Sequence, residues 1–234
     1  MGTYTEHGSR GIYVCEFDPA SGHLSSPELA AESSSPSFLA VNSSRRFLYA
    51  VNEIDKFHDQ PTGAVSAFVL DLTTGRLALL NQVSSHGPGP AFITLDQTGH
   101  YALVANYDGG SVAVFPILPD GKIGDATAFI LHKGFSVNPE RQEAPHAHAI
   151  AMSPDNRFAL VADLGLDQIL VYPFDAAHGT LGNARIYYCH PGDGPRHLVF
   201  SADGKFLYVI NELRSTVTVN AYYPLGGAIS PVQN

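Results

Sequence analysis

Apolar and polar residues alternate along nearly the whole chain. Segments such as "FLYAVN" from Phe47 and "YALVAN" from Tyr101 are rich in aromatic and β-branched residues and are bounded by polar turns. The spacing of three to four residues that marks an amphipathic helix is absent from the sequence. Short apolar segments between Gly, Asp and Asn turns predict an all-β protein built from antiparallel strands.

Four stretches of the chain repeat one arrangement: a short apolar strand, a polar turn and a second apolar strand ending in Asn or Asp. They read "PSFLAVNSSRRFLYAVNE", "PAFITLDQTGHYALVANY", "AHAIAMSPDNRFALVADL" and "PRHLVFSADGKFLYVINE". A third alternating segment follows each stretch, and a fourth follows the first three. Four short strands repeated about every 50 residues are typical of β-propeller blades. A β-sandwich is the alternative, but it does not repeat its strand pairs in this way.

We therefore expect one β-propeller domain over residues 1–234, made of four-stranded antiparallel blades. The expected blade limits are about 1–35, 36–86, 87–132, 145–190 and 191–234. The first and last of these five blades are expected to be incomplete. "GTYT" is interpreted as the second strand of the first blade, and the chain is expected to stop inside the last one.

Aligning the blades on the last residue of the second strand brings three sets of residues into register. The strand-end residues are Asn52, Asn106, Asp163 and Asn211. The residues fifteen positions earlier are Ser37, Ala91, His148 and Arg196. The residues one position later are Glu53, Tyr107, Leu164 and Glu212. Because the first two strands of a blade run antiparallel, all three sets are expected at one mouth of the central channel.

His148 and Arg196 stand where two other blades have the small residues Ser37 and Ala91. A polar or charged side chain at a buried channel position costs desolvation energy unless it is paired or solvated. We therefore expect a catalytic set of His148, Arg196 and Glu212. The arginine would hold an oxyanion, the carboxylate would activate water and the histidine would move a proton.

Further residues near the same mouth are candidates for binding substrate. They are His146, Asn211, Asp163, Asn106, Glu53, Arg141 and Lys133. Structural roles compete with this interpretation: the strand-end Asn side chains can bond neighbouring backbone, Glu53 can be solvated and His146 can be a filler at the rim. His197 is expected to face the packed side of its strand as a core histidine.

A metal site is the other interpretation of "HAH" at positions 146–148. Zinc needs three or four convergent ligands, the sequence offers no third one nearby, and Arg196 would repel a cation. Calcium bound through Asp163 and Glu212 is a comparable alternative. We expect no metal and no cofactor.

Composition narrows the range of partners. The formal charge is −9, with 13 Lys and Arg against 22 Asp and Glu, so the basic surface needed for binding nucleic acid is missing. No apolar run approaches the ~18–20 residues of a membrane span. Cys15 and Cys189 are expected to be separate thiols in the cytoplasm, although a removed signal peptide is an alternative. We expect a small-molecule partner and neither nucleic acid nor membrane.

The chain resembles the seven-bladed propeller lactonases, a family that includes one type of 6-phosphogluconolactonase and the carboxymuconate lactonising enzymes. The resemblance rests on "GTYT", "GIYVCEFDPASGHL", "HYALVANYDGGSVAVFPI", "PHAHAIAMSPDNRFALVADL" and "GPRHLVFSADGKFLYVINEL". It implies a cofactor-free reaction with His148, Arg196 and Glu212 in the site. Seven blades need about 350 residues, so we expect this sequence to be part of a longer chain.

Three hypotheses for function follow. The first is hydrolysis of a sugar δ-lactone, foremost 6-phospho-D-glucono-1,5-lactone of the pentose phosphate pathway, with Lys133, Arg141 and Arg196 meeting the phosphate. The second is lactonisation of an aromatic-catabolism intermediate, with Arg196 holding a carboxylate. The third is a non-catalytic propeller that serves as an interaction scaffold. The variation at the channel-lining position favours the enzymes, and the absence of a G-x-S-x-G motif disfavours a serine nucleophile.

Overall fold

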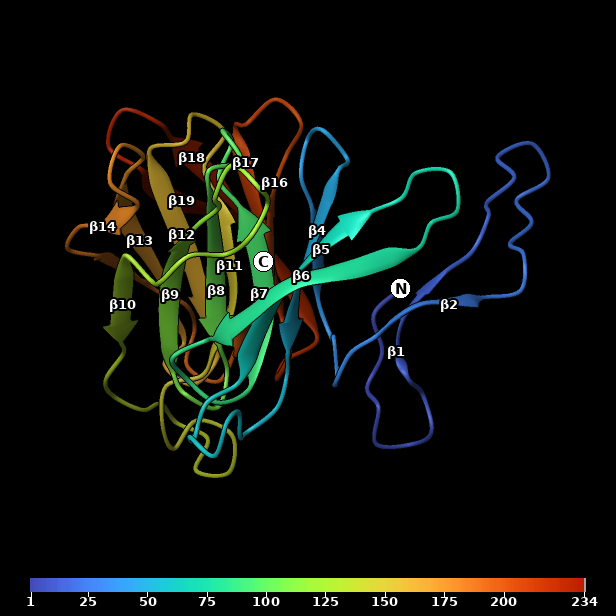
Figure 1. The fold of residues 1–234 in the computed structure, drawn as a ribbon. Coiled ribbons are helices and arrows are strands. Elements are labelled where there is room, and N and C mark those ends of the chain that lie inside the picture. Colours follow the sequence, from blue (N-terminus) through green and yellow to red (C-terminus); the bar gives the residue numbers. More distant parts are fainter. Residues whose placement is uncertain (234) are drawn as a thin grey trace.

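The computed structural model describes residues 1–233, and all the regular elements among them are β-strands. The prediction of an all-β propeller with four-stranded antiparallel blades is confirmed: the sheets follow one another in chain order, as Figure 1 shows. We number these sheets blade 1 to blade 5 along the chain.

Blades 2 and 3 each contain four strands in sequential order. Blade 2 consists of β3 (Leu39–Val41), β4 (Phe47–Asn52), β5 (Ala64–Leu70) and β6 (Leu77–Ser84). Blade 3 consists of β7 (Pro90–Leu95), β8 (Tyr101–Asn106), β9 (Ser111–Pro116) and β10 (Ala128–Leu131).

Blades 4 and 5 follow the same plan. Blade 4 consists of β11 (Ala147–Met152), β12 (Phe158–Asp163), β13 (Gln168–Asp175) and β15 (Arg185–Tyr188), and the short β14 (Thr180–Leu181) pairs with the end of β13. Blade 5 consists of β16 (Pro195–Phe200), β17 (Phe206–Asn211), β18 (Thr216–Tyr223) and β19 (Ala228–Gln233). The expectation of an incomplete last blade is therefore wrong, because β19 forms its fourth strand.

Blade 1 contains only β1 (Gly11–Val14) and β2 (Glu28–Glu32), which lie to one side of the molecule beyond β4–β6 (Figure 1). "GTYT" is not a strand, contrary to expectation. Met1 and Tyr13 exchange backbone hydrogen bonds of 2.7 and 2.8 Å, so the first residues run beside β1. Tyr4 is not part of a β-strand, and it lines the mouth of the channel.

Apolar side chains fill the spaces between neighbouring blades. One cluster joins Leu103 and Val114 of blade 3 to Ile150 and Val161 of blade 4, and three of these four side chains come from central strands buried on both faces. Similar clusters lie between the other successive blades. These contacts hold the inner strands in fixed positions around the channel.

A β-bulge interrupts the inner strand of three blades at the same place. The register of each strand with its partner shifts between Pro90 and Phe92, between Ala147 and Ala149, and between Pro195 and His197. The residues inside these bulges are Ala91, His148 and Arg196. A bulge redirects side chains out of strict alternation, so the residue after the bulge need not point into the core.

Three of the four strand-end residues, Asn52, Asn106 and Asp163, connect their blade to the preceding one. Asn52 donates to Ser33 Oγ and Ser34 O, Asn106 donates to Ser85 O, and Asp163 accepts from His132. Ser33, Ser85 and His132 occupy equivalent positions. Each follows the outermost strand of its blade, and its backbone N–H bonds the residue just before the strand that pairs with this outermost strand. These side chains therefore tie successive blades together.

Candidate functional site

A cleft of about 480 Å³ opens at the mouth of the channel. Five of the residues proposed from the sequence line it: His148, Arg196, Glu212, Glu53 and Arg141. The inner strands contribute the first two, the ends of the second strands the next two, and the loop before β11 the last. The blade alignment brought four of them to one mouth, and the structure places them there.

Glu212 lies between two arginines. Its Oε2 accepts from Arg196 Nε at 2.8 Å, and its Oε1 accepts from Arg141 Nη2. Burial alone would raise the pKa of Glu212, but the hydrogen bonds and charges of Arg141 and Arg196 outweigh it and hold that pKa below its ordinary value. The carboxylate is therefore ionised at neutral pH, and both of its oxygens are engaged.

His148 is buried, with 7% of its surface exposed, and its Nδ1 has no hydrogen-bond partner among the described residues. Burial, reinforced by the positive charge of Arg196, lowers the pKa of His148 to about 4. The imidazole is neutral at pH 7, and His148 lines the cleft while its unpaired Nδ1 is buried in the cleft wall. An unsatisfied buried polar group of this kind is costly to leave unpaired.

His197 also lines the cleft, which corrects the expectation of a packed core histidine. The bulge at Arg196 turns it toward the channel, where its ring meets that of His148 edge to face at 5.1 Å between centroids. Its Nε2 lies 3.4 Å from Arg196 Nη1. Burial, together with the charge of Arg196, lowers the pKa of His197 as well.

Two tyrosines complete the cleft and were not proposed from the sequence. Tyr4 donates its hydroxyl to Glu53 Oε2 at 2.9 Å, and burial together with this bond raises the pKa of Tyr4 to about 12. Glu53 is therefore a paired residue of the cleft wall. Tyr107 packs its ring edge to face with His148 at 5.3 Å. Tyr107 follows Asn106 and so shares the position of Glu53 and Glu212, a signal that the alignment contained.

His146 does not line the cleft. Its ring stacks on Tyr107 at 4.5 Å, Nδ1 donates to Tyr107 O at 3.1 Å, and Nε2 lies 3.3 Å from Glu143 Oε1. Both ring nitrogens are thus occupied by protein partners. The residue supports Tyr107 rather than a ligand.

Asn106, Asp163 and Asn211 are also absent from the cleft wall. They are buried, and their side chains contact neighbouring blades or their own turns: Asn106 bonds Ser111, Asp163 accepts from the His146 and Leu166 backbone, and Asn211 bonds residues of β18. These structural ties replace the expected contact with substrate. Lys133 is exposed and lies outside the cleft wall too.

The two histidines of "HAH" do not converge on a common point, since His146 contacts Tyr107 and Glu143 while His148 faces the cleft. Across residues 1–233 no group of three or more His, Cys, Asp or Glu side chains is arranged to hold a metal ion. The chemistry available in the cleft is that of two guanidinium groups, two carboxylates, two imidazoles and two phenols.

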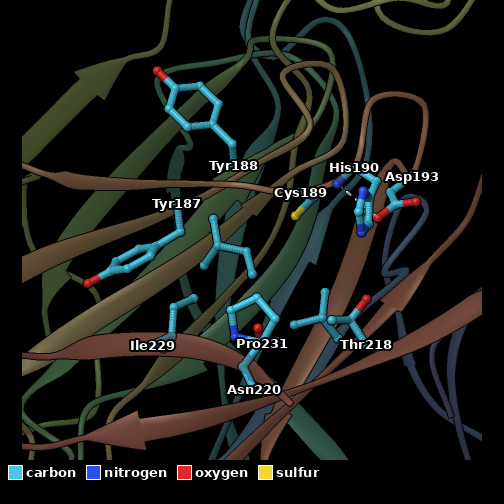
Figure 2. A pocket seen from close by; sticks show the side chains of 11 residues that line it. Tyr187, Tyr188, Cys189, His190, Asp193, Thr218, Asn220, Ile229 and Pro231 are labelled. Atoms are coloured by element: carbon cyan, nitrogen blue, oxygen red, sulfur yellow. Dashed lines mark hydrogen bonds between the residues drawn. The ribbon is translucent and has the colours of Figure 1, made fainter. Parts of the chain in front are cut away.

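A second cavity, of about 230 Å³, lies between blades 4 and 5 (Figure 2). Its wall is largely apolar, with Tyr187, Ile229 and Pro231 among the side chains drawn around it. Burial raises the pKa of the Cys189 thiol to about 12, so this thiol stays protonated and is a poor nucleophile. The cavity lacks the opposed cations and carboxylates of the channel mouth.

Comparison with known proteins places the chain among the propeller lactonases. Residues 1–234 match the model of the family described as "Lactonase, 7-bladed beta-propeller", and the chain belongs to this family. Among curated relatives, it is 34% identical over 233 residues to a 6-phosphogluconolactonase of Bacillus subtilis and 33% identical over 234 residues to one of Formosa agariphila. These matches cover 100% and 97% of this chain, which spans 64% of the length of each relative.

Solved structures agree. The periplasmic gluconolactonase of Pseudomonas aeruginosa superposes with a TM-score of 0.92 at 36% identity, over 99% of this chain and 66% of that one. A protein from Lactobacillus plantarum gives a TM-score of 0.89 at 32% identity, over 99% and 64% of the two chains. The described residues contain no helix that could span a membrane.

Proposed function

We propose that the protein hydrolyses a sugar δ-lactone, foremost 6-phospho-D-glucono-1,5-lactone to 6-phosphogluconate, by cofactor-free acid–base chemistry at the channel mouth. Membership of the lactonase family supports this activity, and two curated relatives are named 6-phosphogluconolactonase. The pentose phosphate pathway and a cytoplasmic location follow from that substrate and are proposed with it. One structural relative is named as periplasmic.

One observation carries the proposal: a buried, neutral histidine lines a cleft that also holds an ion-paired arginine and carboxylate. His148 and Arg196 come from the inner strands of adjacent blades, Glu212 follows the second strand of blade 5, and all three line one cleft. Lactone hydrolysis needs an acceptor for a water proton and a cation for the oxyanion. This set supplies both without a covalent intermediate.

In the proposed reaction, the neutral imidazole of His148 accepts a hydrogen bond from the attacking water and Glu212 accepts its proton. The water oxygen bonds to the lactone carbonyl carbon, and the negative charge that develops on the carbonyl oxygen is stabilised by Arg196. The acyl–oxygen bond of the ring then breaks. The proton returns to the ring oxygen, which becomes a hydroxyl group, and the new carboxylic acid ionises.

An assay of the full-length protein on 6-phospho-D-glucono-1,5-lactone, corrected for spontaneous hydrolysis, tests the activity. We expect acceleration by the wild type and a loss of about 10²–10³-fold in kcat for Arg196→Ala, the effect of removing one oxyanion donor. Arg76→Ala is the control, because Arg76 precedes β6 at the opposite end of the strands. No acceleration by the wild type contradicts the activity, and full activity in Arg196→Ala contradicts the site.

A further inference from the structure

The loop between β10 and β11 is held in place on both sides of Arg141. Gln142 is fully buried, donates to Leu164 O at 2.9 Å and accepts from the Asn138 backbone at 3.0 Å. Ser136 donates to Asp167 Oδ2 at 2.5 Å. The backbone of this loop is therefore fixed against blade 4, and only the Arg141 side chain extends over the cleft.

Arg141 makes contacts that are available for exchange. Its Nη2 donates to Glu212 Oε1 and lies 3.3 Å from the Tyr107 hydroxyl, while 43% of its side chain is exposed. An exposed ion pair contributes only about 0–1 kcal/mol. An incoming oxyanion offers the same guanidinium a two-point hydrogen-bonded partner, so replacing Glu212 costs little.

Arg196 holds the other oxygen of the same carboxylate. It lies on the inner strand of blade 5, the blade that also carries Glu212, and its Nε bonds Glu212 Oε2 at 2.8 Å. Glu212 thus has one partner within its own blade and one from a neighbouring loop. If Arg141 leaves, Oε1 is freed while the Arg196 contact still orients the carboxylate.

We propose that Arg141 exchanges Glu212 for an oxyanion group of the substrate, a phosphate or carboxylate remote from the reacting carbonyl, and thereby frees Glu212 Oε1 to accept the proton of water. This inference rests on the proposed function and adds a means of regulating it. The anionic group through which the substrate is bound also frees the carboxylate that acts as the base. Glu53 is already paired with Tyr4, and Arg196 is held by Glu212 of its own blade. Arg141, whose side chain is 43% exposed, is therefore the cation of the cleft that an added anion can recruit.

The exchange has a consequence for the titration of Glu212. The charged and titratable groups that surround it are Arg141, Arg196, His148 and His197, with Tyr107 beyond Arg141. Both histidines are kept neutral by lowered pKa values, so the arginines dominate the electrostatics. Removing Arg141 from the carboxylate, by substitution or by a bound anion, raises the pKa of Glu212 toward its ordinary value.

The kinetic test compares two substrates in the full-length protein: 6-phospho-D-glucono-1,5-lactone and the uncharged D-glucono-1,5-lactone. For Arg141→Ala we expect kcat/KM on the phosphorylated lactone to fall about tenfold to a hundredfold, the effect of one charge-assisted hydrogen bond. On the uncharged lactone it should stay the same or rise, with the acidic limb of its pH profile moved to higher pH. Arg141→Lys should retain part of the preference for phosphate, and Arg76→Ala should change neither substrate.

An equal loss on both lactones overturns the exchange, because Arg141 would then serve the reaction regardless of the substrate anion. A thermal unfolding curve of each variant separates this outcome from misfolding. Because Arg141 is partly exposed, we expect the unfolding temperature of Arg141→Ala to stay close to that of the wild type.

A second measurement needs no turnover. Carbon-13 NMR of labelled glutamate carboxyls, with the Glu212 signal assigned by its absence in Glu212→Gln, gives the titration midpoint of this residue. Inorganic phosphate should raise the midpoint in the wild type and leave it unchanged in Arg141→Ala. An unchanged midpoint in the wild type overturns the exchange. If the wild type hydrolyses neither lactone, the proposed function fails while this titration still decides the exchange.

Discussion

The contact between blades 2 and 3 and the contact between blades 3 and 4 use the same two positions with different chemistry. The first is neutral: Asn106 Nδ2 donates to the backbone carbonyl of Ser85 at 3.0 Å. The second pairs His132 with Asp163, whose side chains are 1% and 0% exposed and lie 2.6 Å apart. A buried ionisable pair replaces a neutral one at the contact next to the proposed site.

The histidine in this pair is itself held from the far side. Tyr172 donates its hydroxyl to His132 Nε2 at 2.9 Å, and His132 Nδ1 donates to Asp163 Oδ2. Asp163 Oδ1 accepts from the backbone N–H groups of His146 at 2.8 Å and Leu166 at 3.2 Å. The network therefore fixes the chain immediately before the bulge that carries His148. The difference between the two contacts is that the one behind His148 is a buried network of ionisable side chains that also holds the start of β11.

The largest expected effect comes from removing one partner of the buried His132–Asp163 pair. His132→Ala leaves the Asp163 carboxylate buried without its imidazole, and an uncompensated buried charge costs about 3–5 kcal/mol. We expect the free energy of unfolding, measured with urea, to fall by this amount. Ser85→Ala, the change at the equivalent position, keeps the bond from Asn106 to the Ser85 backbone carbonyl and removes the 2.7 Å bond from Ser85 Oγ to Gly87 O, so it should cost only about 1 kcal/mol. Equal losses in the two variants would show that the two contacts are equivalent.

A second prediction concerns the titration of His148 in blade 4, at the position where blade 3 has the non-titrating Ala91. The pKa of His148 is lowered from 6.5 to about 4, so the unfolded chain binds a proton there more readily than the folded one. The stability that this gives is fully present above pH 6.5 and is lost as pH falls through 6.5 toward 4. Its size, at 1.36 kcal/mol per unit, is on the order of 3 kcal/mol.

His148→Asn should remove this loss. We expect the difference in unfolding free energy between wild type and His148→Asn to shift by that amount between pH 7 and pH 4, measured by urea unfolding at each pH. The ring of His197 lies 5.1 Å from that of His148, and its charge is one cause of the lowered His148 pKa, so the shift reports the coupled titration of the two imidazoles. A difference that does not change with pH would mean that His148 is solvated and titrates normally.

The sequence alone predicted the fold well, because the same pair of strands with the turn between them occurs four times and each copy indicates one blade. It also predicted that His148, Arg196 and Glu212 would meet, because residues at one repeat position reach one channel mouth. It missed His197, because the bulge at Arg196 breaks the alternation on which that prediction depended. Sequence periodicity carries no sign of such a bulge.

Other errors arose where neighbouring blades meet. Asp163 and Asn106 were correctly placed at strand ends, yet their partners are supplied by the preceding blade and cannot be found within their own repeat. His132 lies 31 residues before Asp163, and only the packing of two sheets brings the pair together. Tyr4 was not predicted in the cleft, because its segment "GTYT" was expected to be a strand. In the structure this segment is not a strand, and Tyr4 lines the cleft.

The smallest expected effect comes from converting the His132–Asp163 contact into the residue types of the Ser85–Asn106 contact. His132→Ser combined with Asp163→Asn gives this contact the residue types of Ser85 and Asn106, so no buried carboxylate is left unpaired. Replacing both partners of a buried polar pair is close to neutral compared with removing one. We expect the double variant to unfold within about 1–2 kcal/mol of the wild type, and the coupling between the two substitutions to be about 2–3 kcal/mol in a double-mutant cycle. Additive losses would mean that His132 contributes by filling space rather than by pairing with Asp163.

The same double variant also tests whether the charge of Asp163 reaches the channel mouth. The amide side chain that Asp163→Asn introduces still offers a carbonyl oxygen to the backbone N–H of His146, the bond that Asp163 Oδ1 accepts in the wild type. The start of β11 should therefore stay in place, and the affinity of the cleft for inorganic phosphate, measured by titration calorimetry, should change little. A large loss of phosphate binding in a well-folded double variant would instead show that the charge of Asp163, and not merely its hydrogen bonds, acts on the cleft.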